Sequence, residues 1–183
     1  MIAQVETKTY TAQEYLEAEV NSLDRHEFIN GEIVLMAGGS PDHNEIAINL
    51  GGALKLALKG KPYRTFSSDQ RLWVPQLNNY TYPDLMVVAK PIELQSGRTD
   101  TITNPLLIAE VLSKGTRAYD RDDKFAAYRS IPSFQEYLLI DQYRLRVEQY
   151  SKTDANKWIF SEYSSTGDRL MLMSVQVEIA IAD

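Results

Sequence analysis

The chain has 183 residues, of which 44% are hydrophobic and 24% are charged, and these values are typical of a globular domain rather than a disordered chain. It contains no cysteine and only two histidines, which excludes disulfides, thiolate zinc sites, cysteine nucleophiles and three-histidine metal sites built from one chain. Its 19 basic and 25 acidic residues give a net charge of −6, which excludes nonspecific coating of nucleic acid and requires any phosphate-binding charge to be local.

The N-terminal segment predicts a helix followed by a hairpin. Its first ten residues lack the basic and apolar regions of a signal peptide, and no apolar stretch approaches the roughly 18 residues of a spanning helix, so we expect a cytoplasmic protein without a membrane span. Thr11 and Glu14 have the spacing of a capping box and predict a short helix that ends near Glu19. Asn30-Gly31 then predicts the turn of a β-hairpin over residues 25–36.

A second helix is predicted to begin at Ser40-Pro41, because serine is a favoured N-cap and proline suits the first helical position. Apolar residues at helical spacing extend this helix to about Lys59. His43 precedes Ile46 and Leu50 by three and seven residues, so its side chain is expected on the same inward face. His43 is therefore a candidate site residue, although a satisfied core histidine is the commoner outcome.

After residue 62 the pattern changes to short β-rich runs, two of which are apolar on both faces, as in central strands covered by helices. A helix is predicted over residues 116–131, since Pro132 disfavours its continuation. Together these elements predict a mixed α/β or α+β fold in a single domain, residues 1–183. The predicted strands cover residues 63–75, 81–89, 105–112, 136–140, 144–151, 157–165 and 170–181, and residues 90–104 are predicted to form a loop.

Two acidic residues interrupt the apolar strand runs, Asp84 in YPDLMVVA and Glu110 in LLIAEVL. A buried carboxylate without a partner costs several kcal/mol, so each is expected to be paired, hydrogen-bonded or bound to a cation. If the two strands are neighbours in register, both carboxylates converge on one point, which is the arrangement that a hard cation such as Mg²⁺ requires. The simpler alternative, in which each acid only accepts hydrogen bonds or pairs with an arginine, fits the sequence about equally well.

Two further charged residues are weaker candidates. Lys124 follows Asp120 by four residues, so an exposed ion pair on one helix is the simpler interpretation. Lys124 also shares a helix face with Tyr128, and its partly buried stem can direct the ammonium at the two strand carboxylates. Asp69 could supply a third acid, but a local role in a turn is the simpler interpretation.

Several short motifs occur together in a fixed order along residues 10–150. They are Asn30-Gly31-Glu32-Ile33, Ser40-Pro41-x-His43, Pro83-Asp84, Glu110-Val-Leu-Ser113, Asp120-x-x-x-Lys124-x-x-x-Tyr128 and Glu136-Tyr-Leu-Leu-Ile-Asp141. In this order and spacing the sequence resembles the Uma-two family of predicted restriction endonucleases, which is abundant in cyanobacteria and placed in the PD-(D/E)XK nuclease superfamily. The resemblance implies a restriction-endonuclease-like core, with a central mixed β-sheet flanked by helices and an added N-terminal helix and β-hairpin.

The resemblance also implies a metal-dependent endonuclease that hydrolyses DNA phosphodiester bonds, with Asp84, Glu110 and Lys124 as catalytic residues. Asp84 and Glu110 would hold Mg²⁺, for which Mn²⁺ is a possible substitute. The superfamily pattern places a lysine two residues after Glu110, where this sequence has Leu112; Lys124 is the matching position in this family and Lys114 is the alternative. A homodimer is expected, since two-fold symmetry suits cutting both strands. The residues expected to line the site are His43, Asp69, Arg121 and Tyr128.

Two other interpretations stay open at the level of sequence. The first is a nuclease-like domain that binds nucleic acid or a partner protein without cleaving it, which the missing lysine at position 112 and the net charge favour. Basic residues gather in segments 55–64 and 114–129, and both groups suit a phosphate-binding surface or a solvated helix face. The second uses the two acids as a glycosidase pair, but Trp73 and Trp158 are too few and too scattered to line a sugar cleft.

Overall fold

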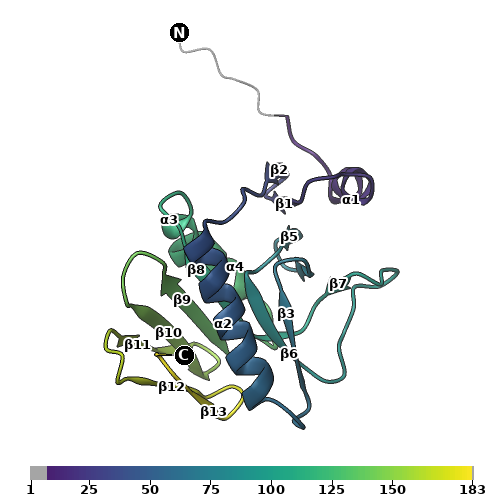
Figure 1. The fold of residues 1–183 in the computed structure, drawn as a ribbon. Coiled ribbons are helices and arrows are strands. Elements are labelled where there is room, and N and C mark those ends of the chain that lie inside the picture. Colours follow the sequence, from purple (N-terminus) through teal and green to yellow (C-terminus); the bar gives the residue numbers. More distant parts are fainter. Residues whose placement is uncertain (1–7, 183) are drawn as a thin grey trace.

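The computed structural model describes residues 8–182, and six of their strands form one large sheet (Figure 1). These strands are β3 (Tyr63–Ser67), β6 (Leu85–Ala89), β8 (Pro105–Leu112), β9 (Glu136–Asp141), β10 (Val147–Asp154) and β11 (Lys157–Tyr163). They lie in the order β11-β10-β9-β8-β6-β3, with β8 and β9 parallel and the other neighbouring pairs antiparallel. β8 therefore lies inside the sheet, with β6 on one side and β9 on the other.

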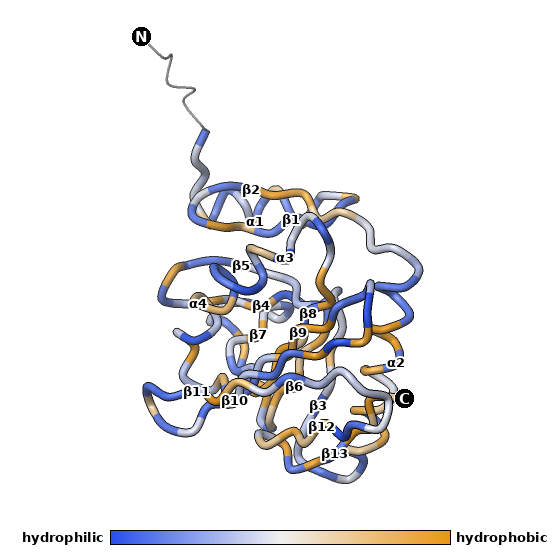
Figure 2. Tube along the Cα trace, turned by 90° about the vertical axis from the view of Figure 1, so that its left-hand side faces the viewer, coloured by the Kyte–Doolittle hydropathy of each residue, from blue (hydrophilic) through white to orange (hydrophobic). Residues whose placement is uncertain are grey.

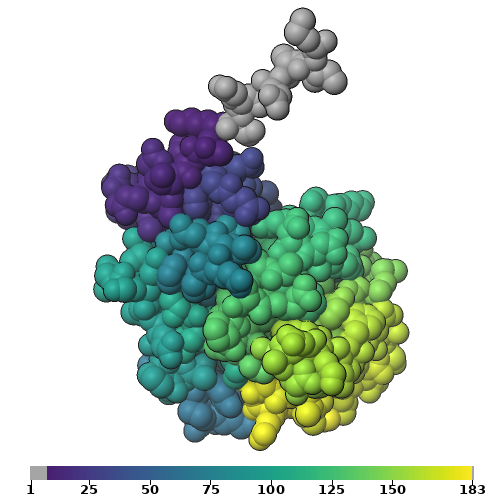
Figure 3. Space-filling model, turned by 180° about the vertical axis from the view of Figure 1, so that it is seen from behind, coloured from purple at the N-terminus to yellow at the C-terminus, as the bar shows by residue number. Residues whose placement is uncertain are grey.

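A smaller sheet lies at the N-terminal end of the molecule. Its strands are β1 (His26–Ile29), β2 (Glu32–Leu35), β4 (Arg71–Val74), β5 (Asn79–Thr81) and β7 (Thr101–Ile102), in the order β2-β1-β5-β4-β7. A separate antiparallel pair, β12 (Arg169–Leu172) and β13 (Val177–Ala180), ends the described chain. In Figure 3 the N-terminal segment, in purple, lies at one end of the molecule and the C-terminal strands, in yellow, lie at the other.

The helices begin at the residues that the sequence predicts. Glu14 N donates to the Thr11 side chain at 3.2 Å and the Glu14 carboxylate accepts from Thr11 N at 2.7 Å, which confirms the capping box. His43 N donates to Ser40 Oγ at 3.1 Å, which confirms the second N-cap. The helices are α1 (Ala12–Val20), α2 (Pro41–Ala57) and a continuous helical segment made of α3 (Arg117–Tyr119), the π-helical η1 (Asp120–Lys124) and α4 (Phe125–Tyr128).

None of the helices within residues 8–182 combines the length and the apolar composition needed to span a membrane.

Two hydrophobic clusters cover opposite faces of the large sheet. Met86 and Ile108 pack with Tyr128 on the α4 side, whereas Val87 packs with Leu54 on the α2 side. Successive side chains of a strand point to opposite faces, so β6 and β8 supply both clusters and must be apolar throughout. Figure 2 shows this concentration of hydrophobic residues, in orange, along the strands in the middle of the molecule. The predicted mixed α+β fold, with a mixed sheet flanked by helices, is confirmed.

The structure differs from the predicted strands in several places. The predicted run 63–75 is divided between the two sheets, because a turn after Ser67 separates β3 from β4. The predicted loop 90–104 contains β7, whose two residues are too few to show a periodic pattern. The hairpin itself is confirmed, with Asn30 and Gly31 at φ of 51° and 89°, the left-handed region that its turn requires.

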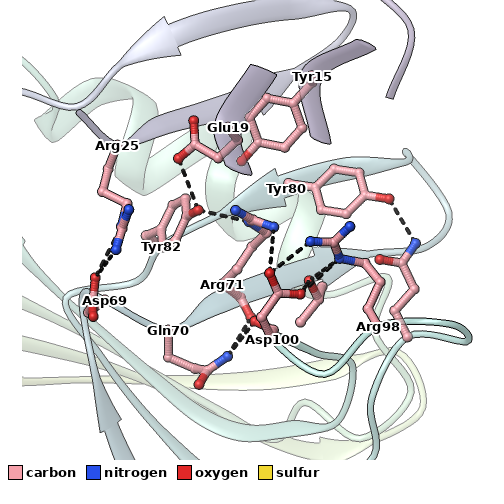
Figure 4. A network of polar contacts seen from close by, with 12 residues as sticks. Tyr15, Glu19, Arg25, Asp69, Gln70, Arg71, Tyr80, Tyr82, Arg98 and Asp100 are labelled. Carbon is pink, nitrogen blue, oxygen red and sulfur yellow. Dashed lines mark hydrogen bonds and ion pairs between the residues drawn. The ribbon is translucent and has the colours of Figure 1, made fainter. Parts of the chain in front are cut away.

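A buried polar network fixes the N-terminal helix to the smaller sheet (Figure 4). Arg71 Nε donates to the Tyr82 hydroxyl at 2.8 Å, and this hydroxyl donates to the Glu19 carboxylate at 3.1 Å. The Arg71 guanidinium also lies 3.2 Å from the carboxylate of Asp100 and 5.7 Å from the ring centroid of Tyr15. Arg71 therefore joins α1 to β4 and to the segment before β7, which fixes the N-terminal helix to the smaller sheet.

Candidate active site

Two carboxylates meet where β6 begins. Leu85 pairs with Ala109 in the antiparallel register of β6 and β8, so Asp84, directly before β6, lies opposite Glu110. Val111 N donates to Asp84 Oδ2 at 2.7 Å, and Asp84 N donates to Glu110 Oε2 at 3.2 Å. Each acid is thus held by a backbone N–H of the other's segment. The neighbouring strands bring together the two acids that the sequence singled out.

Glu110 is only 3% exposed and accepts further hydrogen bonds from one helix. The Tyr128 hydroxyl donates to Glu110 Oε1 at 2.9 Å and the Lys124 ammonium donates to the same oxygen at 3.2 Å. Burial raises the pKa of the Glu110 carboxyl to about 8, because desolvation outweighs the opposing effect of the nearby Lys124 charge. Burial likewise raises the pKa of the Tyr128 phenol well above its usual range.

Lys124 is surrounded by carboxylates. Its ammonium lies 3.4 Å from Asp120 Oδ1 and 3.6 Å from Glu27 Oε1, in addition to its contact with Glu110. Burial acts to lower the pKa of this ammonium, but the charges of Glu110, Glu27 and Asp120 raise it well above its usual range. Lys124 is therefore a permanent positive charge inside a group of acids.

Glu27 was missed by the sequence reasoning. It lies on β1, where alternation with the neighbouring Phe28 would give it the outer face of a hairpin. The fold buries both residues, and Tyr82 N donates to the Glu27 carboxylate at 3.3 Å. A strand acid carries no local signal for this burial, since it depends on how the hairpin packs beside Lys124.

His43 reaches the site from α2. Its Nε2 lies 3.2 Å from Asp84 Oδ2, on the inward face that the helical spacing predicts. The hydrogen bond to Asp84 raises the pKa of the imidazole, although burial acts against it. The chain approaches closely here, because a Cβ at Gly39 would lie 2.8 Å from His43 Nδ1. This Nδ1 is buried without a hydrogen-bond partner among the described residues.

The other predicted residues have different neighbours. Asp69 is 80% exposed and its carboxylate accepts from the guanidinium of Arg25 at 2.7 and 3.0 Å, so it is not part of the acid group around Lys124. Arg121 forms a two-bond contact with Glu148, at 2.8 and 3.0 Å, rather than with the acids of the site. The Lys114 ammonium lies 5.4 Å from the ring centroid of Tyr143.

Leu112 explains why no lysine stands at the superfamily position. Its side chain is fully buried in the hydrophobic cluster on the α4 side, where an ammonium would have apolar neighbours. The ammonium near Glu110 comes instead from the helical segment that covers this face, at Lys124. The structure therefore brings together Asp84, Glu110, Lys124, His43 and Tyr128, and it adds Glu27 and Asp120.

The donor set of the site fits a small hard cation. Residues 8–182 contain no group of three or more histidine or acidic side chains arranged to hold a metal ion. Mg²⁺ needs fewer, since proteins usually bind it through one or two carboxylates while it keeps several waters. Asp84 and Glu110 offer two carboxylates, and Asp84 Oδ1 accepts no hydrogen bond from a described residue. The surrounding acids outnumber Lys124 and His43, so added positive charge is favoured here.

Comparison with known proteins places these residues in a family. The sequence model of Uma2, described as "Putative restriction endonuclease", matches residues 12–182. This chain belongs to the Uma2 (Uma-two) family. Membership agrees with the motifs around Asp84, Glu110 and Lys124, and the predicted recognition is confirmed.

Two relatives of this Uma2 protein come from Synechocystis. The uncharacterized protein sll1609 is 43% identical over 162 residues, which cover 88% of this chain and 92% of that protein. The uncharacterized protein slr1290 is 36% identical over 169 residues, which cover 92% of this chain and 87% of that protein. A crystal structure from Anabaena variabilis, described as a putative nuclease belonging to DUF820, matches 97% of both chains with a TM-score of 0.77 and 17% identity. At this identity the likeness shows the fold alone.

Proposed function

We propose that this Uma2-family protein is a metal-dependent endonuclease that hydrolyses DNA phosphodiester bonds at Asp84, Glu110 and Lys124. One observation carries the proposal: Asp84 and Glu110 lie opposite each other on neighbouring strands, and the Lys124 ammonium lies 3.2 Å from Glu110. The family's description and the likeness of the fold to a nuclease structure support the same activity.

The residues of the site have distinct parts in this proposal. Asp84 and Glu110 would hold Mg²⁺, or Mn²⁺ in its place, through carboxylate oxygens. When bound, the ion would neutralise charge on the scissile phosphate and lower the pKa of a water molecule. His43, at 3.2 Å from Asp84, fixes the orientation of that carboxylate from the side of α2.

Lys124 acts as a fixed positive charge rather than as a base, because its acidic neighbours keep its ammonium protonated. In the hydrolysis, the oxygen of a water forms a bond to phosphorus and the bond from phosphorus to the leaving sugar oxygen breaks. The water loses one proton and the leaving oxygen gains one, so the reaction is balanced. Negative charge builds up on the phosphoryl oxygens in the transition state, and a preorganised ammonium stabilises it or orients the attacking water.

The proposal is tested with isosteric variants. Asp84→Asn and Glu110→Gln keep the shape of the site but remove a negative charge each, and we expect cleavage of plasmid DNA in Mg²⁺ to fall by at least about 100-fold. Calorimetric titration with Mn²⁺ should show that both variants lose a binding site that the parent protein has. Asp123→Asn is the matched control, since Asp123 is exposed on η1. Unchanged cleavage by both site variants would contradict the proposal.

A second candidate is a nuclease-fold domain that binds nucleic acid or a partner protein without cleaving it. The absence of a lysine two residues after Glu110 favours it, since the buried Leu112 stands there. The same Mn²⁺ titration separates the two candidates: a noncleaving domain shows no specific site that depends on Asp84 and Glu110. The homodimer and the cytoplasmic location expected from the sequence stay predictions.

A further inference from the structure

A groove of about 460 Å³ lies between α2 and β3, with Asp84 among its lining residues. We call it the α2–β3 groove. Ser67, at the end of β3, pairs with Leu85. Ser67 and Ser68 therefore line the end of the groove that lies beside Asp84. On the α2 wall, Asn44 and Lys55 are about three turns, or roughly 16 Å, apart. The groove volume lies in the range of roughly 300–1,000 Å³ that is typical of ligand sites.

Small residues on α2 keep this groove open. Ala47 and Gly51 lie on the helix face that lines it, and a Cβ at Gly51 would come within 3.2 Å of the Leu85 side chain. Larger side chains at these two positions would fill the space between the helix and the sheet. Ile48, on the same face, is 72% exposed and forms an apolar part of the wall.

The polar groups of the groove suit a phosphate backbone. Within the described residues, no hydrogen bond or ion pair engages the side chains of Asn44, Lys55, Ser67 or Ser68. Lysine, serine and asparagine side chains are among those that contact phosphate and sugar oxygens in DNA complexes. Among the described residues that line the groove, Asp84 alone is acidic, and it lies at the end where the candidate metal ligands meet.

We propose that the α2–β3 groove binds the sugar–phosphate backbone of the DNA strand beside the phosphate that is hydrolysed. Ser67 and Ser68 contact the backbone next to Asp84, and Lys55 contacts a phosphate further along the strand. The inference rests on the proposed function, because Asp84 marks the end of the groove where hydrolysis takes place. These contacts are to the backbone, so they position the strand without selecting its sequence.

The test uses two opposite substitutions at one exposed position. Ile48→Glu and Ile48→Lys place a negative or a positive charge on the same wall, and the high exposure of Ile48 makes both compatible with the fold. Binding to a fluorescent DNA duplex is measured by anisotropy with metal ions chelated. We expect Ile48→Glu to weaken binding about two- to fivefold and Ile48→Lys to strengthen it by a similar factor. Equal affinities of the two variants would overturn the proposal.

Lys55→Ala provides an independent measurement. Loss of one phosphate contact should weaken binding and reduce the slope of log K against log salt by about 0.9. Lys157→Ala is the control, because Lys157 is exposed on β11, the opposite edge of the sheet from β3. A parent protein that binds no DNA, or a Lys55 variant with the parent's salt dependence, would overturn the assignment of the groove.

Chelation of metal separates this inference from the proposed activity. Charge-dependent binding by the groove variants, without cleavage of DNA by the parent protein in Mg²⁺, would support the groove and contradict the endonuclease. Cleavage by the parent protein with identical binding by all groove variants would support the endonuclease and contradict the groove.

Discussion

The Lys124 ammonium and Glu110 Oε1 lie 3.2 Å apart in the interior of the protein, where Lys124 is 8% exposed and Glu110 is 3% exposed. The lysine comes from the helical segment that packs on the sheet, and the glutamate comes from a central strand. Leu112, two residues after Glu110, is committed to the hydrophobic cluster beneath that segment. A cation can therefore approach Glu110 from the covering helix while the strand keeps an apolar side chain at the position where the superfamily has lysine.

Replacement of Lys124 by methionine should destabilise the fold strongly. The change leaves Glu27, Glu110 and Asp120 without their common cation, and loss of one partner of a buried ion pair costs about 3–5 kcal/mol. Urea denaturation above about pH 8, where Glu110 is ionised as well as Glu27 and Asp120, measures the free energy of unfolding. The double variant Lys124→Met/Glu110→Gln should recover part of the loss, because one uncompensated charge is removed with the lysine. Equal stability of the single and double variants would show that the two residues are not coupled.

The stability of the protein should fall between about pH 5 and pH 8 because of Glu110. Burial raises the pKa of this carboxyl from 4.5 to about 8, so in this range the folded state holds a proton that the unfolded state has released. The contribution of protonated Glu110 to the free energy of unfolding is fully present below pH 4.5. It is lost as the pH rises through 8, at up to about 1.4 kcal/mol per pH unit. Unfolding measured across this range should show a shallower fall for Glu110→Gln. Parallel curves for the two proteins would contradict the assignment.

Much of the fold could be predicted because its signals are local. The capping residues Thr11 and Ser40 and the Asn30-Gly31 turn act through their own backbone neighbours, and each does in the structure what its residue type predicts. The division of the run 63–75 could not be predicted, since it depends on which sheet each half joins. β strands gain most of their stability from partners distant in sequence, so their pairing leaves little trace in a single run.

The candidate site was predictable where an acid interrupts an apolar strand. Asp84 and Glu110 stood out because a buried carboxylate demands a partner, and the register of β6 and β8 brings them together. Asp69 and Glu27 show the limit of this reasoning. Asp69 lies in an exposed turn and forms an ion pair with Arg25, whereas Glu27 is buried only because the hairpin packs beside Lys124. Both outcomes depend on tertiary contacts that residue type and spacing do not encode.

Arg71→Lys should loosen the N-terminal helix. Arg71 binds the Tyr82 hydroxyl and Asp100 with different nitrogens, and a lysine ammonium cannot reproduce this fork. We expect a loss of about 1–3 kcal/mol in the free energy of unfolding and faster hydrogen exchange in α1 and β1 than in α2. Arg169→Lys is the control, since Arg169 is an exposed partner of Glu178 and should change stability by less than about 0.5 kcal/mol. Unchanged exchange in α1 would contradict the anchoring role of Arg71.

Glu136→Ala should release the C-terminal strand pair from the large sheet. Glu136 is fully buried at the start of β9, and its carboxylate accepts hydrogen bonds from Met173 N and Ser174 N, both at 3.1 Å, and from the side chains of Gln149 and Ser151. An alanine leaves these donors without an acceptor. Each donor that stays buried should lower the free energy of unfolding by about 1–3 kcal/mol.

Hydrogen exchange by mass spectrometry gives the decisive readout for Glu136. Exchange in β12 and β13 should accelerate, while β6 and β8, which donate no hydrogen bond to this carboxylate, should keep their protection. Glu136→Gln should have a smaller effect, because its amide oxygen still accepts from one of the two backbone N–H groups. Glu45→Ala, at an exposed position of α2, controls for the loss of a charge. Uniform acceleration over the whole sheet would instead show that Glu136 supports global stability rather than the attachment of β12 and β13.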